Sequence, residues 1–141
     1  MKKSLAKCEI PHHNNKKRLV AVKGVLKKEG RILLTQRALN DTLGGMYEFP
    51  GGGIEEGEYL LNALKRELQE EVGYENILDL TYISCIDIPS KQIHLVYYFV
   101  HSNDYPQILE DQIDLVWVES FPKDLILTPE TKKILLEVFS S

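Results

Sequence analysis

Residues 51–73 read GGGIEEGEYLLNALKRELQEEVG, three glycines followed by an acidic segment and a run of helical periodicity. Apolar residues recur through the second half at intervals of three and four residues, as in an amphipathic helix. Gly73 is a natural end for that helix, because glycine readily adopts the left-handed conformation of a helix terminus. We therefore predict a helix over residues 59–72. Its expected apolar stripe consists of Leu61, Leu64, Leu68 and Val72.

The same helix carries Glu67, Glu70 and Glu71, spaced i, i+3 and i+4, which places their side chains on one flank. The helix can thus pack through its apolar stripe and present carboxylates on the adjacent side. Three neighbouring carboxylates repel one another unless they share a cation. Mg²⁺ prefers oxygen ligands and commonly bridges protein carboxylates to substrate phosphates. The residues alone leave two interpretations open, a divalent-metal site and a solvated acidic helix face.

The residues around the acids suit the first interpretation. The glycines allow the backbone to approach a ligand closely and expose carbonyl oxygens as further ligands. Arg66 lies among the acids and can fix one carboxylate through a two-pronged hydrogen bond.

The spacing of this segment resembles the Nudix box, G-x5-E-x7-R-E-U-x-E-E-x-G-U, where U is apolar. At an average usage of roughly 7% per residue, seven fixed positions match by chance on the order of 10⁻⁸ times per starting point. The likeness therefore favours the metal site over the solvated face. Tyr74 departs slightly from the pattern, because an aliphatic residue is usual at the last position. The seven fixed positions are met by Gly52, Glu58, Arg66, Glu67, Glu70, Glu71 and Gly73.

The likeness extends from about Leu19 to the C-terminal helix, and the sequence YEFPGG at residues 47–52 is similar to the segment before the box in the MutT-type branch. The resemblance implies an α/β/α sandwich, with a mixed β-sheet between the box helix and a C-terminal helix. It also implies an enzyme that uses Mg²⁺, or Mn²⁺ as an alternative, to cleave a nucleoside diphosphate linked to another group. Nucleoside triphosphates, cleaved to monophosphate and pyrophosphate, are the expected substrates. ADP-ribose or another nucleotide-sugar is the alternative.

The resemblance also assigns residues to roles. Glu67 or Glu70 is expected to orient or deprotonate the attacking water, while Arg66 and Glu58 orient the acids. Family members often add an acid a few residues before a Trp, and here Asp111 is the expected ligand. Glu110 and Asp114 also precede Trp117, and all three acids are equally explained as solvated loop residues. The expected metal ligands are the backbone carbonyl of Gly51 and the side chains of Glu67, Glu70, Glu71 and Asp111.

Three charged residues are expected to contact the substrate. Arg37 ends the second predicted strand, where MutT-type enzymes place an arginine near the nucleotide, and Lys91 follows Pro89. Glu48 lies in the segment before the box. Arg37 and Lys91 are equally explained as surface cations. The rings at positions 97–99 can stack on a base, although at least one of them is expected in the core.

Two features bear on the choice of substrate. The asparagine with which MutT-type enzymes read the purine has no clear counterpart, because Thr128-Pro129-Glu130 occupies that region. Pro89 lies 15 residues beyond the box, a position associated with ADP-ribose pyrophosphatases. A proline in a hairpin turn explains Pro89 equally well.

The remaining elements follow from apolar runs and turn residues. Thr128 and Pro129 predict a helix start, since a hydroxyl caps the first turn and proline suits its first position. We expect one domain over residues 18–141, preceded by a flexible basic arm over residues 1–17. Strands are predicted over residues 19–26 and 31–37, and around 77–88, 92–101 and 113–119.

Composition limits the class of protein. The chain has 141 residues, 43% hydrophobic and 27% charged, which fits one globular domain without membrane spans. A net charge of −4 gives no basic field for a nucleic-acid polymer. The basic N-terminus is followed by no apolar signal segment, so we expect a cytoplasmic protein. Cys8 and Cys85 belong to no metal-ligand spacing and are expected to be reduced thiols.

Two further expectations concern assembly and activity. The resemblance implies a nucleotide substrate and a homodimer, because Nudix proteins are often dimers. A non-catalytic nucleotide-sensing module is the alternative from another class of protein. Such a module is expected to lose box carboxylates, and this chain retains them all.

Overall fold

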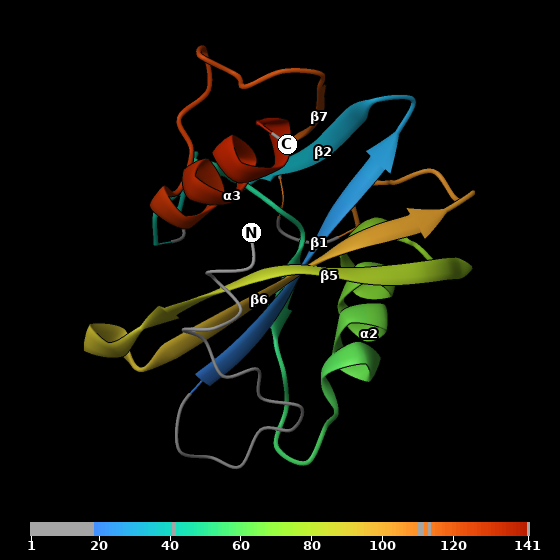
Figure 1. Ribbon diagram of the computed structural model, residues 1–141, viewed down its shortest axis with the longest axis vertical. Coiled ribbons are helices and arrows are strands. Elements are labelled where there is room, and N and C mark those ends of the chain that lie inside the picture. The colour runs from blue at the N-terminus through green and yellow to red at the C-terminus, as the bar shows by residue number, and fades with distance from the viewer. Residues whose placement is uncertain (1–18, 41, 110–111, 113, 141) are drawn as a thin grey trace.

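The computed structural model describes residues 19–40, 42–109, 112 and 114–140 (Figure 1). The predicted basic arm, residues 1–17, lies outside these ranges. Elements keep the labels of Figure 1. The strands are β1 (Leu19–Lys28), β2 (Arg31–Gln36), β3 (Tyr47–Glu48), β4 (Gly51–Gly53), β5 (Ile77–Ile88), β6 (Ile93–Ser102) and β7 (Asp114–Val118). The helices are α2 (Leu60–Val72) and α3 (Pro129–Phe139), with a 3₁₀ turn, η1 (Pro89–Lys91), between β5 and β6.

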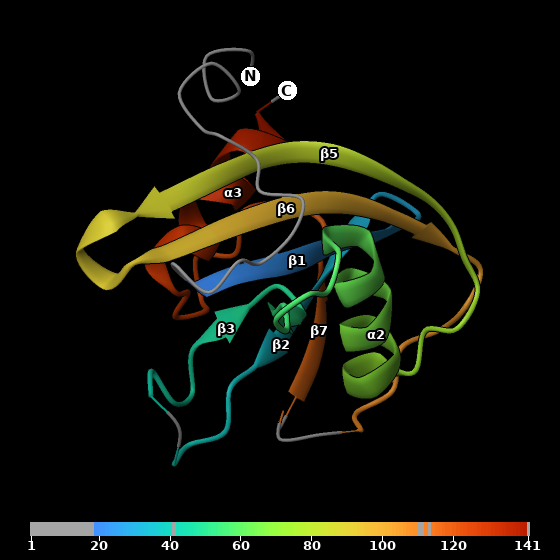
Figure 2. The ribbon, with the colours of Figure 1, turned by 90° about the horizontal axis from the view of Figure 1, so that it is seen from below.

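The strands form a mixed sheet in which β1 is the shared member. β1 runs parallel to β6 along most of its length, and β6 pairs antiparallel with β5 through the η1 turn. The first half of β1 also pairs with β4, whereas its last two residues pair with β2. β2 in turn pairs with β3 and β7. One strand thus joins two parts of the sheet that diverge from each other (Figure 2).

Alternation along β1 gives the sheet two apolar faces. Val20, Val22 and Leu26 belong to a cluster that contains the buried side of α2. Ala21 and Val25 belong to a second cluster, which contains the buried side of α3. Successive strand residues point to opposite faces, so this division follows from the strand period of two. The helices cover opposite faces of the sheet (Figures 1 and 2), which confirms the predicted α/β/α sandwich.

Helix α2 follows the prediction closely, with one correction. It ends at Gly73, whose φ of 76° is left-handed and whose N–H bonds back to the carbonyl of Gln69. Leu61 was expected in the apolar stripe, but it is 42% exposed. Leu60 takes its place one residue earlier, four residues before Leu64 on the same helical face. The buried set is Leu60, Ala63, Leu64, Leu68 and Val72.

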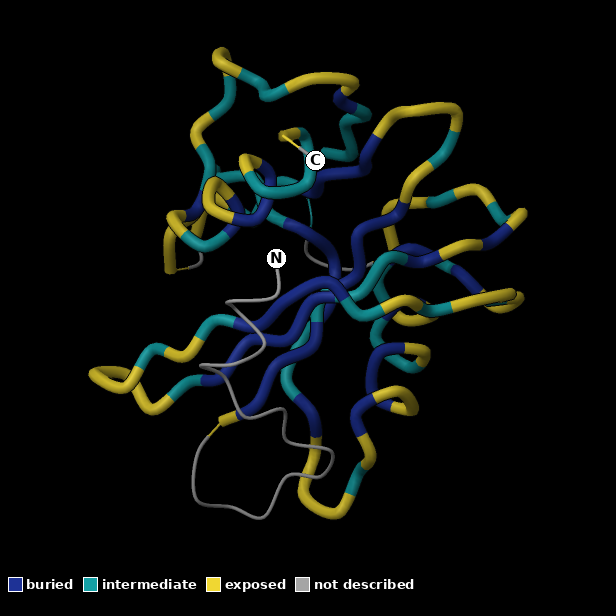
Figure 3. Tube along the Cα trace, viewed as in Figure 1, coloured by how far each residue is buried: buried dark blue, intermediate teal, exposed yellow. Residues whose placement is uncertain are grey.

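Helix α3 begins as predicted. The Thr128 hydroxyl accepts a hydrogen bond from the backbone N–H of Thr131 at 3.4 Å, and Pro129 occupies the first helical position. Ile134 and Leu135 are fully buried in the cluster between α3 and the sheet. Figure 3 shows that α3 alternates between buried and exposed segments.

Three features differ from or add to the sequence expectations. The glycines at 51–53 form a short strand against β1 rather than only a loop. Pro89 begins the turn between β5 and β6, which agrees with its interpretation as a hairpin proline.

Cys85 is disulfide-bonded, so the expectation of a reduced thiol is wrong at this position; Cys8 lies outside the described residues. Local spacing does not reveal a disulfide. Within the described residues, no helix is long and apolar enough to cross a membrane.

The packing of α2 predicts unequal effects for two leucines of the same helix. Leu68→Ala removes a fully buried side chain and should lower the free energy of unfolding by about 2 to 5 kcal/mol. Leu61→Ala, at an exposed position, should lower it by less than about 1 kcal/mol. Urea denaturation followed by circular dichroism measures both. Equal losses would contradict the assignment of the buried face.

Candidate active site

The acidic cluster, Glu67, Glu70 and Glu71, lies on the flank of α2 that faces the glycine strand β4. A side-chain carbon built on Gly52 would lie 2.5 Å from the Glu67 carboxylate, so only glycine leaves room for it. The backbone N–H of Gly51 donates to Glu71 Oε1 at 3.4 Å. The acids therefore lie on one flank of α2, as the helical spacing predicts. Glu67 and Glu71 on this flank pack against the backbone of β4.

Glycine is also required at position 51, because of its backbone conformation and its closeness to β1. Its φ is 143°, in the region that side-chain-bearing residues avoid, and a Cβ there would collide with the carbonyl oxygen of Val22. This conformation lets β4 run close beside β1, with Gly51 paired to Lys23.

Arg66 connects the acidic cluster to the loop before the helix. Its Nε donates to Glu58 Oε2 at 2.7 Å and its Nη2 to Glu58 Oε1 at 2.9 Å, a two-pronged pair. Its Nη1 donates to Glu67 at 3.0 Å and to Glu70 at 3.2 Å. Its Nη2 also reaches the carbonyl oxygen of Gly53 at 3.2 Å. One guanidinium thus fixes the loop, the helix and the glycine strand relative to one another.

The pairing of Arg66 with Glu58 keeps both groups charged. Hydrogen bonding from Arg66 is the main cause that lowers the pKa of the Glu58 carboxyl, and the bond to Glu58 is the main cause that raises the pKa of Arg66. Glu58 Oε1 also accepts from the backbone N–H of Glu55 at 2.9 Å, which closes the loop before the helix. The orienting positions expected of Arg66 and Glu58 therefore have a geometric basis.

Glu71 is held from two sides, by β4 and by the segment before β7. Besides the Gly51 bond, its Oε1 accepts from Gln112 Nε2 at 2.9 Å. Burial is the main cause that raises the pKa of the Glu71 carboxyl; Lys23 opposes the rise, and the charge and hydrogen bond of Glu67 add to it. Two carboxyl groups therefore face each other where a proton or a cation is needed between them.

The donor set fits a hard cation, although the site is not closed around one. Among the described residues, no three acidic, histidine or cysteine side chains converge closely enough to enclose a metal ion as they stand. The reason is visible in the contacts: Glu67 and Glu70 are turned toward Arg66, while Glu71 is held by Gly51 and Gln112. A cation between Glu67 and Glu71 would relieve the repulsion of their facing carboxyl groups.

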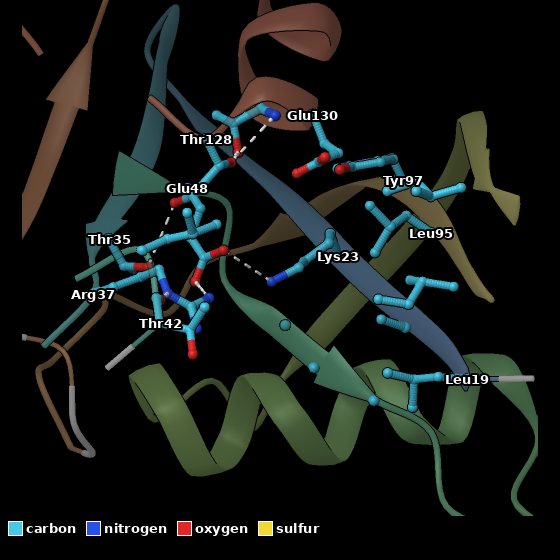
Figure 4. A pocket seen from close by; sticks show the side chains of 18 of the residues that line it. Leu19, Lys23, Thr35, Arg37, Thr42, Glu48, Leu95, Tyr97, Thr128 and Glu130 are labelled. Carbon is cyan, nitrogen blue, oxygen red and sulfur yellow. Dashed lines mark hydrogen bonds and ion pairs between the residues drawn. The ribbon is translucent and has the colours of Figure 1, made fainter. Parts of the chain in front are cut away.

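A cavity of about 740 Å³ opens beside this cluster on the α3 side of the sheet (Figure 4). Glu71 and the glycine strand line one part of it, and the first turn of α3 lines another. This volume is within the range of small-molecule binding pockets.

The structure brings the expected substrate residues Arg37, Glu48 and Lys91 to this cavity. Arg37 Nη1 donates to Glu48 Oε2 at 3.0 Å, and its Nε donates to the Thr42 carbonyl at 2.8 Å. Lys91, in η1, is exposed and lines the cavity.

The aromatic residues of β6 separate by face. Tyr97 lines the cavity and is only 1% exposed, packed edge to face with Phe49 at 5.8 Å between ring centroids. Tyr98 packs on the α2 side and Phe99 against the α3 cluster, and neither lines the cavity. The expectation that at least one of the three belongs to the core is confirmed. Of the three, Tyr97 alone lies where a substrate could touch it.

The segment before Trp117 reaches the acidic cluster through a residue that the sequence did not single out. Asp111, the expected ligand, lies outside the described residues, as does Glu110. Asp114 instead accepts a hydrogen bond from the Tyr47 hydroxyl at 3.0 Å. Gln112 contacts Glu71 directly.

Lys23 was also missed from sequence. It lines the cavity and forms an ion pair with Glu48 at 3.5 Å. The available signal was a charged residue inside the apolar run of β1, where the strand is otherwise buried.

An α/β/α sandwich with an acidic helix packed against a glycine strand is the architecture of a Nudix hydrolase. A family model described as the NUDIX domain matches residues 16–136, so the chain belongs to this family.

Individual proteins and solved structures that are similar to this chain point to the same family. The chain is 37% identical over 89 residues to 8-oxo-dGTP diphosphatase of Proteus vulgaris, covering 61% of this chain and 79% of that protein. It is 30% identical over 130 residues to nucleoside triphosphatase NudI of Escherichia coli, covering 79% and 89%. Among solved structures, the MutT NUDIX hydrolase from Burkholderia pseudomallei superposes with a TM-score of 0.76 at 25% identity, covering 86% of this chain and 98% of that one.

The close approach of Gly52 to Glu67 predicts a steric test of the cluster. Gly52→Ala should displace the Glu67 carboxylate and raise the Mg²⁺ concentration needed for half-maximal activity by about tenfold or more. Gly53→Ala is the matched control, because its added carbon meets only Leu19 Cδ1 at 3.4 Å and the Val20 carbonyl oxygen at 3.9 Å, both ordinary contacts. Activity titrations against Mg²⁺ compare the two. Wild-type Mg²⁺ dependence in both variants would contradict a role for Glu67 in cation binding.

Proposed function

We propose that this protein is a Mg²⁺-dependent pyrophosphohydrolase that cleaves nucleoside triphosphates to a nucleoside monophosphate and pyrophosphate. The observation that carries the proposal is the complete acidic cluster beside a nucleotide-sized cavity: Arg66 holds Glu67 and Glu70, and Glu71 lines the cavity wall. The named activities of relatives support the substrate class, since they include an 8-oxo-dGTP diphosphatase and a nucleoside triphosphatase.

Glu67, Glu70, Glu71 and the backbone carbonyl of Gly51 would hold the divalent cation, with Asp111 as a further proposed ligand. When bound, Mg²⁺ neutralises charge on the phosphate oxygens and lowers the pKa of a coordinated water. Mn²⁺ offers the same oxygen-seeking chemistry as an alternative.

The residues of the chain position the attacking water and accept its proton. Water adds its oxygen to one phosphorus, the anhydride bond to the leaving phosphate breaks, and the proton of the water passes to Glu67 or Glu70. Glu70 is suited to accept this proton because its side chain is 46% exposed and Arg66 binds only one of its carboxylate oxygens. Arg66 and Glu58 keep the acids in place while charge develops, which is the preorganisation that phosphoryl transfer requires.

The far side of the cavity is proposed to bind the nucleoside. Arg37 is fixed by Glu48 and Thr42, so its guanidinium is oriented before a ligand enters. Tyr97 and the first turn of α3, including Glu130, line the same region (Figure 4). Lys91 is proposed to contact the substrate from the rim.

The alternatives have less support. Pro89 begins a hairpin turn, so its position needs no explanation from ADP-ribose recognition. A sensing module is disfavoured because every box carboxylate is retained. A homodimer, a cytoplasmic location and the absence of a nucleic-acid partner remain predictions.

Product analysis tests the proposal. The purified protein is incubated with Mg²⁺ and canonical triphosphates, 8-oxo-dGTP, ADP-ribose and a nucleotide-sugar, each with and without chelator. Chelator-sensitive release of monophosphate and pyrophosphate from triphosphates is the expected result. Release of AMP from ADP-ribose alone would move the substrate class, and tight binding without turnover would favour the sensing module.

The exposure of Glu70 predicts that activity and folding separate. Glu70→Gln should reduce turnover by at least about 100-fold, because it removes a ligand charge from the cluster. It should change the free energy of unfolding by less than about 1 kcal/mol, because the side chain is half exposed. Glu75→Gln, an exposed acid just beyond the helix, is the control and should remain active. Turnover by Glu70→Gln at the wild-type rate would refute the assignment.

A further inference from the structure

Lys23 is a charged residue in the middle of an otherwise apolar strand. β1 is buried at Val22 and Gly24 on either side of it, and Ala21 and Val25 of the same strand face belong to the α3 cluster. A lysine is rarely placed in such a strand, because its ammonium group is costly to remove from water without partners. The local surroundings must therefore supply a reason for this cation.

The partners of Lys23 account for only part of its capacity. Its side chain is 14% exposed, and its Nζ forms an ion pair with Glu48 at 3.5 Å. Among the described residues, this ion pair is the only polar side-chain contact of Lys23, although an ammonium group carries three N–H donors. Glu48 is shared, since Arg37 binds its other oxygen at 3.0 Å. Lys23 thus keeps N–H donors for something that enters the cavity.

Lys23 lies between two ends of the cavity, one lined by Arg37 and Glu48 and the other by Glu71. On one side are Glu48 and Arg37, which belong to the proposed nucleoside end; on the other is Glu71, with which Lys23 interacts electrostatically. Figure 4 shows the Lys23 side chain pointing from β1 toward Glu48. A ligand that reached from the nucleoside end to the acidic cluster would pass this ammonium group.

We propose that Lys23 binds the phosphate of the substrate nearest the nucleoside, as a cation built into the sheet beside the acidic cluster. This inference rests on the proposed function, because it assumes a nucleoside phosphate that spans the cavity. Lys23 would act together with a cation held by the acidic cluster of α2: that cation would supply positive charge to the phosphates, and the Lys23 ammonium group would add to it from β1. Both are favourable where charge is concentrated in a partly buried site.

The competing explanation is that Lys23 is only structural and holds the side chains of Glu48 and Glu71 in position. The two explanations differ in sign for metal binding. If Lys23 binds phosphate, its removal leaves the cluster more negative, and Mn²⁺ without nucleotide should bind equally well or more tightly. If Lys23 only holds the two acids in place, its removal should weaken binding of Mn²⁺ and of nucleotide in the same proportion.

Binding measurements on three variants decide the matter. The probes are Mn²⁺ alone and the non-hydrolysable α,β-methylene analogues of dGTP and dCTP with Mg²⁺, each titrated by calorimetry. Lys23→Met should weaken binding of both analogues by about 10- to 100-fold, the effect of a lost charge-assisted hydrogen bond, and should leave Mn²⁺ affinity unchanged or increased. Lys23→Arg should recover part of the loss. Lys27→Met, on the same strand face but outside this cavity, should bind as wild type.

The outcomes separate this inference from the proposed function. Wild-type affinity of Lys23→Met for both analogues would overturn the role of Lys23, as would a parallel loss of Mn²⁺ binding or a loss confined to one base. If Lys23→Met does not fold, Lys23→Arg decides: analogue binding by Lys23→Arg would support the proposal, whereas a Lys23→Arg protein as stable as Lys27→Met but without analogue binding would overturn it. Analogue binding by the wild-type protein without hydrolysis of any of the nucleoside triphosphates would refute the proposed function alone. No analogue binding by the wild-type protein would refute both.

Discussion

The crowding of three carboxylates on one flank of a short helix is the constraint on which the site depends. Glu67, Glu70 and Glu71 cannot lie this close without cationic partners. In the protein alone, Arg66 meets part of that need by binding Glu67 and Glu70, and it extends the same guanidinium to Glu58 and the Gly53 carbonyl. Glu71 remains, enclosed and facing Glu67, with its pKa raised by burial. The remaining charge is what a divalent cation would balance.

The fold places this constraint beside a cavity through β1. Alternate residues of that strand face opposite helices, so the same ten-residue segment holds α2 against the sheet and floors the cavity on the other side. Its pairing with β4 brings Gly51 and Gly52 between the acidic cluster and the cavity, where side chains would collide with Val22 or Glu67. The need for glycine at these positions is therefore steric and lies in contacts between distant segments.

Local patterns predicted much of this arrangement. The end of α2 at Gly73 and the cap of α3 at Thr128 follow from backbone preferences that act within a few residues. The flank of acids follows from helical periodicity, and the sandwich follows from the resemblance that the box spacing supported. Leu61 shows the limit of periodicity, since a stripe read one residue off still fits the sequence.

Contacts between distant segments were not predictable in the same way. Gln112 meets Glu71 across 41 positions of sequence, and no local signal marks it as a site residue. Lys23 left a signal, a cation in an apolar strand, but only the pairing of β1 with β4 shows that it faces the cavity. Tyr97 could be separated from Tyr98 only when the face of β6 toward each helix was known.

If the facing carboxyl groups of Glu67 and Glu71 require a divalent cation, the protein should bind Mn²⁺ in the absence of nucleotide. The signal of free Mn²⁺ in electron paramagnetic resonance measures uptake by the wild-type protein and by a variant with Glu67→Gln and Glu71→Gln together. We expect saturable uptake by the wild-type protein that is lost in the double variant while the fold persists. Equal uptake by both proteins would contradict it.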